Sequence, residues 1–259
     1  METIAVKLRV EPDWHQAIVG TTGSGKTTLL RMLASSYGAK LDMQGTPLYY
    51  KIWILDTKLN GDFDGIGTHY EVMQEAIQDR TSRIVVYSPN PEEDDYENYE
   101  LFIRLIWERW MIDPRKKNKV RVPAVIVVDE LGMLEIPQRN KSYLDPNKTH
   151  YWSEVMKRGR GSKVVCWNAT QNPIFVPEDF LRLANGFFMF RLNNPADRKR
   201  MAGYMGHEVE APILDPHGFW YYNFGGMLHP HYFKQLNVTA PIQDGQNVRR
   251  TTAIRSLRR

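Results

Sequence analysis

The chain has 259 residues, of which 42% are hydrophobic and 25% charged, a composition typical of a globular protein with a sizeable core. The single cysteine, Cys166, excludes an internal disulfide and fits a reducing compartment. A net charge of +4 is too small to identify a partner, and no apolar stretch approaches the roughly 20 residues that a membrane-spanning helix needs.

Short apolar runs that predict strands alternate with stretches that predict helices. Strands are expected at 17–19, 52–55, 83–87, 122–128, 164–169 and 186–190. Helices are expected near 26–38, 70–79, 97–111, 149–158, 177–184 and 195–205. This alternation predicts an α/β fold, with a mainly parallel sheet and helices on both of its faces.

Residues 17–30 (AIVGTTGSGKTTLL) contain the phosphate-binding loop motif G-x-x-x-x-G-K-[ST] between an apolar strand and the start of a helix. The glycines let backbone N–H groups surround phosphate oxygens, and the helix N-terminus favours anions. Lys26 is expected to reach the β- and γ-phosphates, and the Thr27 hydroxyl to bind Mg²⁺. The motif predicts that ATP or a close relative binds to Gly20, Thr21, Thr22, Gly23, Ser24, Gly25, Lys26, Thr27 and Thr28.

Asp129 and Glu130 follow the apolar run at 124–128, so they lie at the carboxyl end of a predicted central strand. Ligand sites of open α/β sheets lie at this edge, which also holds the phosphate loop. We expect Asp129 to hold Mg²⁺ through a water, and Glu130 to orient and polarise the water that attacks the γ-phosphate. Together the two motifs predict a Mg²⁺-dependent ATP hydrolase.

Motifs of other nucleotide-binding classes are missing from the sequence. The stretch 140–143 (NKSY) has tyrosine where the guanine-binding motif Asn-Lys-x-Asp has aspartate. The Leu-Ser-Gly-Gly-Gln motif of transporter ATPases is absent, and no Asp-Glu-Ala-Asp helicase box follows Asp129. A small-molecule kinase usually lacks a glutamate base beside its site, because it must not transfer phosphate to water. Hydrolysis is therefore the reaction that the sequence favours.

The C-terminal part departs from the alternating pattern. Residues 218–236 hold two aromatic runs on either side of a Gly-Gly pair and predict a β-hairpin attached to the main sheet. Residues 249–259 carry five arginines and few apolar residues, which is typical of a segment without fixed structure. We expect a P-loop ATPase domain over 1–236 and an extended basic arm over 237–259.

The segment 157–177 (KRGRGSKVVCWNATQNPIFVP) resembles the FtsK–HerA superfamily of DNA-pumping ATPases. The corresponding family segment runs from an arginine, here Arg160, through a short strand to Ala-Thr-Gln, here 169–171, and a proline, here Pro173. The stretch 56–58 (DTK) is similar to the family's Asp-Pro-Lys, although threonine replaces the proline. The resemblance covers about 15–192 and implies a RecA-like P-loop NTPase core.

The resemblance implies roles for two further residues. Gln171 would lie at the tip of the strand beside the one that ends in Asp129, where its amide can sense the γ-phosphate or the attacking water. Arg160, on a glycine-flanked turn, would act as an arginine finger in the site of a neighbouring subunit, and Arg158 is the competing candidate. A finger of this kind implies a homo-oligomeric ring, expected to be a hexamer.

The resemblance also implies the function, a motor that translocates double-stranded DNA. The short chain is most like the virus-encoded genome-packaging branch, which would place it in the host cytoplasm or on the virion, with capsid vertex proteins as further partners. Alternatives are a cellular or conjugative DNA pump and a filamentous-phage assembly ATPase. A slow nucleotide-gated binding switch is a further alternative, against which Glu130 argues.

A translocase has to grip backbone phosphates rather than read base edges. The loop 136–150 leaves the same sheet edge as Glu130 and carries Arg139, Lys141 and Lys148 with one acidic residue. We expect these three basic side chains to face the channel of the ring and to contact DNA. An ordinary exposed loop is the alternative, in which case the basic clusters at 115–121 and 249–259 become the candidates.

Overall fold

The computed structural model describes residues 10, 14–38, 51–89, 95–110, 123–134, 150–211, 213–215, 217–223 and 229–232. Its strands are β1 (Gln16–Val19), β2 (Lys51–Leu55), β3 (Thr68–Tyr70), β4 (Ile84–Tyr87), β5 (Ala124–Val128), β6 (Val164–Thr170), β7 (Gly186–Phe190), β8 (Gly218–Asn223) and β9 (His229–Tyr232). Its α-helices are α1 (Lys26–Gly38), α2 (Met73–Gln78), α3 (Asp95–Trp110), α4 (Tyr151–Arg158), α5 (Glu178–Arg182) and α6 (Pro195–Met205). Its 3-10 helices are η1 (Leu131–Leu134), η2 (Gly159–Ser162), η3 (Pro173–Phe175) and η4 (His207–Val209).

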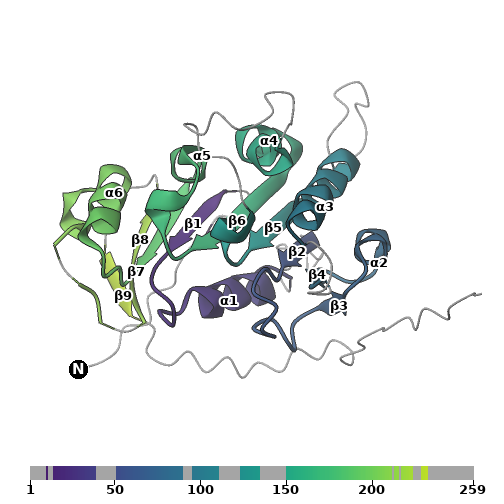
Figure 1. Ribbon diagram of the computed structural model, residues 1–259, viewed down its shortest axis with the longest axis horizontal. Coiled ribbons are helices and arrows are strands. Elements are labelled where there is room, and N and C mark those ends of the chain that lie inside the picture. Colours follow the sequence, from purple (N-terminus) through teal and green to yellow (C-terminus); the bar gives the residue numbers. More distant parts are fainter. Residues whose placement is uncertain are drawn as a thin grey trace, which may run out of the picture.

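All of these strands belong to one sheet, in the order β3-β4-β2-β5-β6-β1-β7-β8-β9 (Figure 1). Neighbouring strands from β3 to β7 are parallel, whereas β8 and β9 are antiparallel to their neighbours. The mainly parallel α/β core is therefore confirmed. The hairpin is confirmed as well, and its strands continue the main sheet. The expected boundary between a domain over 1–236 and an arm over 237–259 stays a prediction, because the arm lies outside the described residues.

Helices cover both faces of the sheet, which explains why its central strands read as unbroken apolar runs. Figure 1 shows α1 on one face and α2 to α5 on the other. In β5, Val125 and Val127 belong to the core beneath α1, while Ala124, Ile126 and Val128 belong to the opposite core. A Val-Ile strand buried on both faces has no polar residue until it ends. The first carboxylate, that of Asp129, therefore lies just beyond the carboxyl end of β5.

The topology separates the phosphate-loop strand from the strand that carries the acidic pair. β1 pairs with β6 on one side and β7 on the other, and β6 in turn pairs with β5. Backbone hydrogen bonds from Gly20 N–H to the Thr170 carbonyl (3.2 Å) and from Thr21 N–H to the Arg191 carbonyl (2.9 Å) fix the loop to these neighbours. Because these strands are parallel, the same side of the sheet holds the carboxyl ends of β1, β2, β5 and β6.

The junction between α4 and β6 requires a glycine at one position and offers a matched control. A Cβ on Gly159 would lie 2.1 Å from the Val164 carbonyl oxygen, whereas a Cβ on Gly161 would meet nothing within 4 Å. We expect Gly159→Ala to lower the free energy of unfolding by about 1–3 kcal/mol, because the backbone must shift. Gly161→Ala should change it by less than about 0.5 kcal/mol. Urea denaturation of both variants measures the difference, and equal stabilities would contradict this packing.

Candidate nucleotide and metal site

The phosphate loop is closed by its own lysine. Gly25 has a φ of 108°, a left-handed conformation that favours glycine, and α1 begins at the next residue. Lys26 is only 4% exposed, and its ammonium donates to the carbonyls of Gly20 (2.7 Å) and Thr21 (3.0 Å). Its charge is thus held over the loop, where the phosphates of a nucleotide would lie.

Lys26 is also electrostatically tuned. Its pKa is lowered from 10.5 to about 8, chiefly by burial; the nearby Lys58 ammonium also lowers it, while the carboxylates of Glu130 and Asp129 raise it. The loop therefore has an ammonium whose charge is costly to bury. An anion placed against it would relieve that cost, so the arrangement favours a phosphate group at this position.

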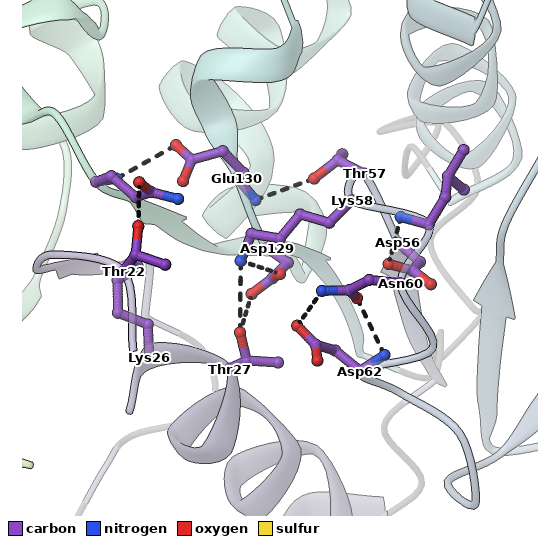
Figure 2. A network of polar contacts seen from close by, with 12 residues as sticks. Thr22, Lys26, Thr27, Asp56, Thr57, Lys58, Asn60, Asp62, Asp129 and Glu130 are labelled. Atoms are coloured by element: carbon purple, nitrogen blue, oxygen red, sulfur yellow. Dashed lines mark hydrogen bonds and ion pairs between the residues drawn. The ribbon is translucent and has the colours of Figure 1, made fainter. Parts of the chain in front are cut away.

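The two residues expected to bind Mg²⁺ are in contact. The Thr27 hydroxyl donates to Asp129 Oδ1 at 2.8 Å, although 102 positions separate the residues in the chain. A third group joins them: the Lys58 ammonium lies 2.5 Å from Asp129 Oδ2 and 3.5 Å from Thr27 Oγ1 (Figure 2). Hydroxyl and carboxylate oxygens are ligands that Mg²⁺ prefers, and the ammonium beside both shows that the position attracts a cation. The residues fit the metal.

Glu130 is held from two sides and leaves one carboxylate oxygen available. Its backbone N–H donates to Thr57 Oγ1 at 3.1 Å, and its Oε1 accepts from the Gln171 backbone N–H at 3.3 Å. Oε2 is buried and has no hydrogen-bond partner among the described residues. A buried acceptor without a partner is rare and calls for a ligand or water. Glu130 is therefore poised to accept from a water molecule.

Gln171 connects the acidic pair to the phosphate loop. Its side-chain oxygen accepts a hydrogen bond from the Thr22 hydroxyl at 2.7 Å, and its backbone holds Glu130. Figure 2 labels Thr22 and Glu130, the two residues that these hydrogen bonds reach. The expected placement of Gln171 at the tip of β6, next to β5, agrees with the strand order.

Sequence reasoning assigned no chemical role to Thr57 or Lys58, which follow β2. The turn that carries them is anchored by Asp56, whose side chain accepts from the Leu59 N–H (3.2 Å) and whose carbonyl accepts from the Tyr99 hydroxyl (2.9 Å). Burial raises the pKa of Asp56. The signal available in the sequence was the stretch 56–58 itself, where a threonine, which has a hydroxyl, replaces proline.

Arg160 is far from the nucleotide site of its own chain. It is exposed in η2, and its charge acts on His15, which directly precedes β1 at the amino edge of the sheet. The seven residues of β6 separate it from Gln171, a span of about 20 Å at roughly 3.3 Å per residue. Arg158, the competing residue, forms an exposed ion pair with Glu154 at 2.9 Å.

The part of the chain that the structure describes contains none of the basic residues proposed for DNA contact. Arg139, Lys141 and Lys148, as well as the clusters at 115–121 and 249–259, lie outside the described residues, so their role stays a prediction. A further basic stretch, residues 191–200 (RLNNPADRKR), is described by the structure, and two of its arginines bind backbone carbonyls of the same chain. Arg198 donates to the Leu192 carbonyl (2.9 Å) and Arg200 to the Ile174 carbonyl (2.7 Å).

Known proteins share this fold. Residues 4–97 match the model of a family described as ABC transporter, which includes the phosphate loop but less than half of the chain. The chain matches no curated protein. The structure of the genome packaging NTPase B204 from Sulfolobus turreted icosahedral virus 2 with AMP is 18% identical, with 86% of this chain and 98% of that chain covered and a TM-score of 0.61.

Two larger proteins are also similar. The pCW3 conjugation coupling protein TcpA is 14% identical, with 90% of this chain and 64% of that chain covered and a TM-score of 0.57. The cytoplasmic domain of the Type VII secretion ATPase EccC from Thermomonospora curvata is 18% identical, with 84% of this chain and 25% of that chain covered and a TM-score of 0.51. The chain has the fold of these P-loop ATPases, which confirms the resemblance to the FtsK–HerA type at the level of the fold. No helix among the described residues is long and apolar enough to cross a membrane.

The pKa of Lys26 predicts how nucleotide affinity depends on pH. Below pH 8 the ammonium is already charged, so affinity should be constant there. Above pH 8 a nucleotide can bind well only if Lys26 takes up a proton, so affinity should fall by up to about tenfold per pH unit. A fluorescent ATP analogue titrated at pH 7, 8 and 9 measures this.

Lys51→Met is the matched control for that titration. Lys51 also has a pKa lowered by burial to about 8, yet it begins β2, at the sheet edge opposite to the phosphate loop. The variant should keep the pH dependence of the wild type. Equal affinities at pH 7 and pH 9 in the wild type would show that Lys26 does not titrate on nucleotide binding.

Proposed function

We propose that the protein is a Mg²⁺-dependent ATPase of the FtsK–HerA type that translocates double-stranded DNA and packages a viral genome into a capsid. The observation that carries the proposal is the meeting of three chemical groups at one sheet edge. These are the phosphate loop with Lys26, the Thr27–Asp129 pair, and Glu130 with a buried oxygen that has no hydrogen-bond partner among the described residues. Each is a component that phosphoryl transfer to water requires.

Nucleotide binding would rest on the loop and its cation position. Backbone N–H groups of the loop and the Lys26 ammonium bind the phosphates, and Thr27 and Asp129 would hold Mg²⁺. A bound Mg²⁺ supplies charge neutralisation on the phosphate oxygens. The mutual contact of Thr27 and Asp129 at 2.8 Å sets the two ligands in position beforehand.

Glu130 is the general base of the proposal. Thr57 fixes its backbone and the Gln171 N–H fixes Oε1, so Oε2 is the atom that takes a proton from the attacking water. The Gln171 side chain, now bonded to Thr22, would respond to a γ-phosphate that competes for the same region. Turnover and the state of the phosphate loop are thereby linked through one residue.

Genome packaging is placed first because of the fold similarity. The TM-score is 0.61 for the viral genome packaging NTPase, against 0.57 for the conjugation coupling protein and 0.51 for the secretion ATPase domain. The proposed partners are duplex DNA, which the loop 136–150 would contact, copies of the same chain in a ring, and proteins of the capsid vertex. A conjugative DNA pump is the second candidate, because TcpA shares the fold over 90% of this chain.

Replacing the proposed base tests hydrolysis directly. Glu130→Gln should bind ATP as the wild type does and lose at least about 10²-fold in kcat, because the amide cannot accept the proton. Glu208→Gln, an exposed glutamate, serves as the control and should hydrolyse ATP normally. Phosphate release and analogue binding are measured on the same samples. Wild-type turnover by Glu130→Gln would remove Glu130 from the mechanism.

Mixed rings test the trans role of Arg160. Arg160 lies at the end of the strands opposite to its own nucleotide site. Arg160→Ala should therefore still bind ATP. A loss of about 10³-fold in kcat is expected if the side chain acts in the site of a neighbouring subunit. Subunits of Arg160→Ala mixed with Glu130→Gln should regain part of the activity, since some interfaces combine an intact base with an intact arginine.

Arg158→Ala is the control for those mixtures, since it breaks only an exposed ion pair with Glu154 and should remain near wild type. Verified mixed rings without any recovered activity would argue that Arg160 is not a trans finger.

A further inference from the structure

Lys58 occupies the place where the proposed metal ligands meet. Its ammonium lies 2.5 Å from Asp129 Oδ2 and 3.5 Å from the Thr27 hydroxyl, and that hydroxyl donates to the other Asp129 oxygen (Figure 2). We infer that Lys58 is a resident counter-ion, which holds the divalent-cation position when no divalent cation is bound and leaves it when Mg²⁺ enters. The inference rests on the metal site of the proposed function and adds a competitor for that site.

Asp129 needs such a counter-ion because of its burial. Its side chain has no exposed surface, and among the described residues the Lys58 ammonium is the group that compensates Oδ2. A buried carboxylate without a cation is strongly unfavourable. Lys26, the other nearby lysine, instead directs its ammonium to the carbonyls of Gly20 and Thr21.

Lys58 and Mg²⁺ cannot hold this position together. A Mg²⁺ ion held by Thr27 Oγ1 and, directly or through a water, by the Asp129 carboxylate would lie close to the Lys58 ammonium, which is 3.5 Å from Thr27 Oγ1 and 2.5 Å from Asp129 Oδ2. Two cations so close together repel each other, so the Lys58 ammonium, which is carried by a flexible side chain, has to move. The Lys58 side chain can do so because it is 22% exposed, whereas that of Asp129 is fully buried.

The turn that carries Lys58 is fixed even though the side chain can leave. Asp56 accepts from the Leu59 N–H, the Tyr99 hydroxyl donates to the Asp56 carbonyl, and Thr57 holds the backbone of Glu130. Departure of the ammonium is therefore a rotation of one side chain, with the base Glu130 still in place. Competition between the Lys58 ammonium and Mg²⁺ sets the Mg²⁺ concentration at which the ion replaces the ammonium in the site.

Binding of Mn²⁺ to the protein without nucleotide, followed by electron paramagnetic resonance of the free ion, tests the inference. Lys58→Met should bind Mn²⁺ at least tenfold more tightly than the wild type, because the competing charge is gone. Lys199→Met removes an exposed lysine of α6 and should match the wild type. Adding Asp129→Asn to Lys58→Met should abolish the gain. An unchanged or weaker affinity in Lys58→Met would overturn the inference.

Thermal unfolding supplies a second readout on the same proteins. In EDTA, Lys58→Met should have a lower Tm than the wild type, and Mn²⁺ should raise its Tm more than that of the wild type. If Lys58→Met does not fold in EDTA, Lys58→Gln, which keeps an N–H donor without the charge, is measured in the same way. A Tm of the folded variant that does not respond to Mn²⁺ would overturn the inference. Neither Mn²⁺ affinity nor Tm depends on ATP turnover. A failure of the Lys58 inference can therefore be told apart from a failure of the proposed ATPase function, which the Glu130→Gln variant tests.

Discussion

The Asp129 carboxylate is fully buried at the end of a strand whose other residues are apolar, and a charge in such a place must be compensated. Two groups from other parts of the chain do this, Thr27 at the start of α1 and Lys58 after β2. The compensation draws the phosphate loop and the turn after β2 toward the end of β5. The geometry of the candidate site depends on this one carboxylate.

The sheet makes that convergence possible. With β6 between β1 and β5, the phosphate loop and the acidic pair lie two strands apart, and the tip of β6 fills the space between them. Gln171 at this tip bonds to the loop through Thr22 and to Glu130 through its backbone. If β5 lay directly beside β1, no such residue would stand between the loop and Glu130. The intervening strand β6 thus places a polar group where the loop and Glu130 can both contact it.

Most of the core could be predicted because its parallel strands are buried on both faces and appear in the sequence as apolar runs. The strand β3 was missed, since its residues 68–70 (THY) are half-buried at the sheet edge and form no apolar run. The phosphate loop and the pair of carboxylates were found because their chemistry is local in sequence. The distance between Arg160 and its own site could not be predicted, as it depends on the direction in which β6 crosses the sheet.

The roles of Thr57 and Lys58 were beyond sequence reasoning for the same physical reason. Thr57 accepts a hydrogen bond from the backbone N–H of a residue 73 positions away, and the partner of Lys58, Asp129, directly follows the neighbouring strand β5. Only the strand order brings β2 beside β5 and makes these contacts possible. The stretch 56–58 departs from the Asp-Pro-Lys pattern that it resembles, but the sequence does not show that the Thr57 hydroxyl accepts a hydrogen bond from the backbone of Glu130.

Displacement of a third strand from a DNA triplex measures the central claim, movement along duplex DNA driven by ATP, most directly. The wild-type protein with ATP and Mg²⁺ should release the third strand at a rate that falls to background when ATP is replaced by a non-hydrolysable analogue. Glu130→Gln should bind the same DNA without releasing it. A wild-type protein that hydrolyses ATP and binds the duplex, yet leaves the triplex intact, would contradict the account.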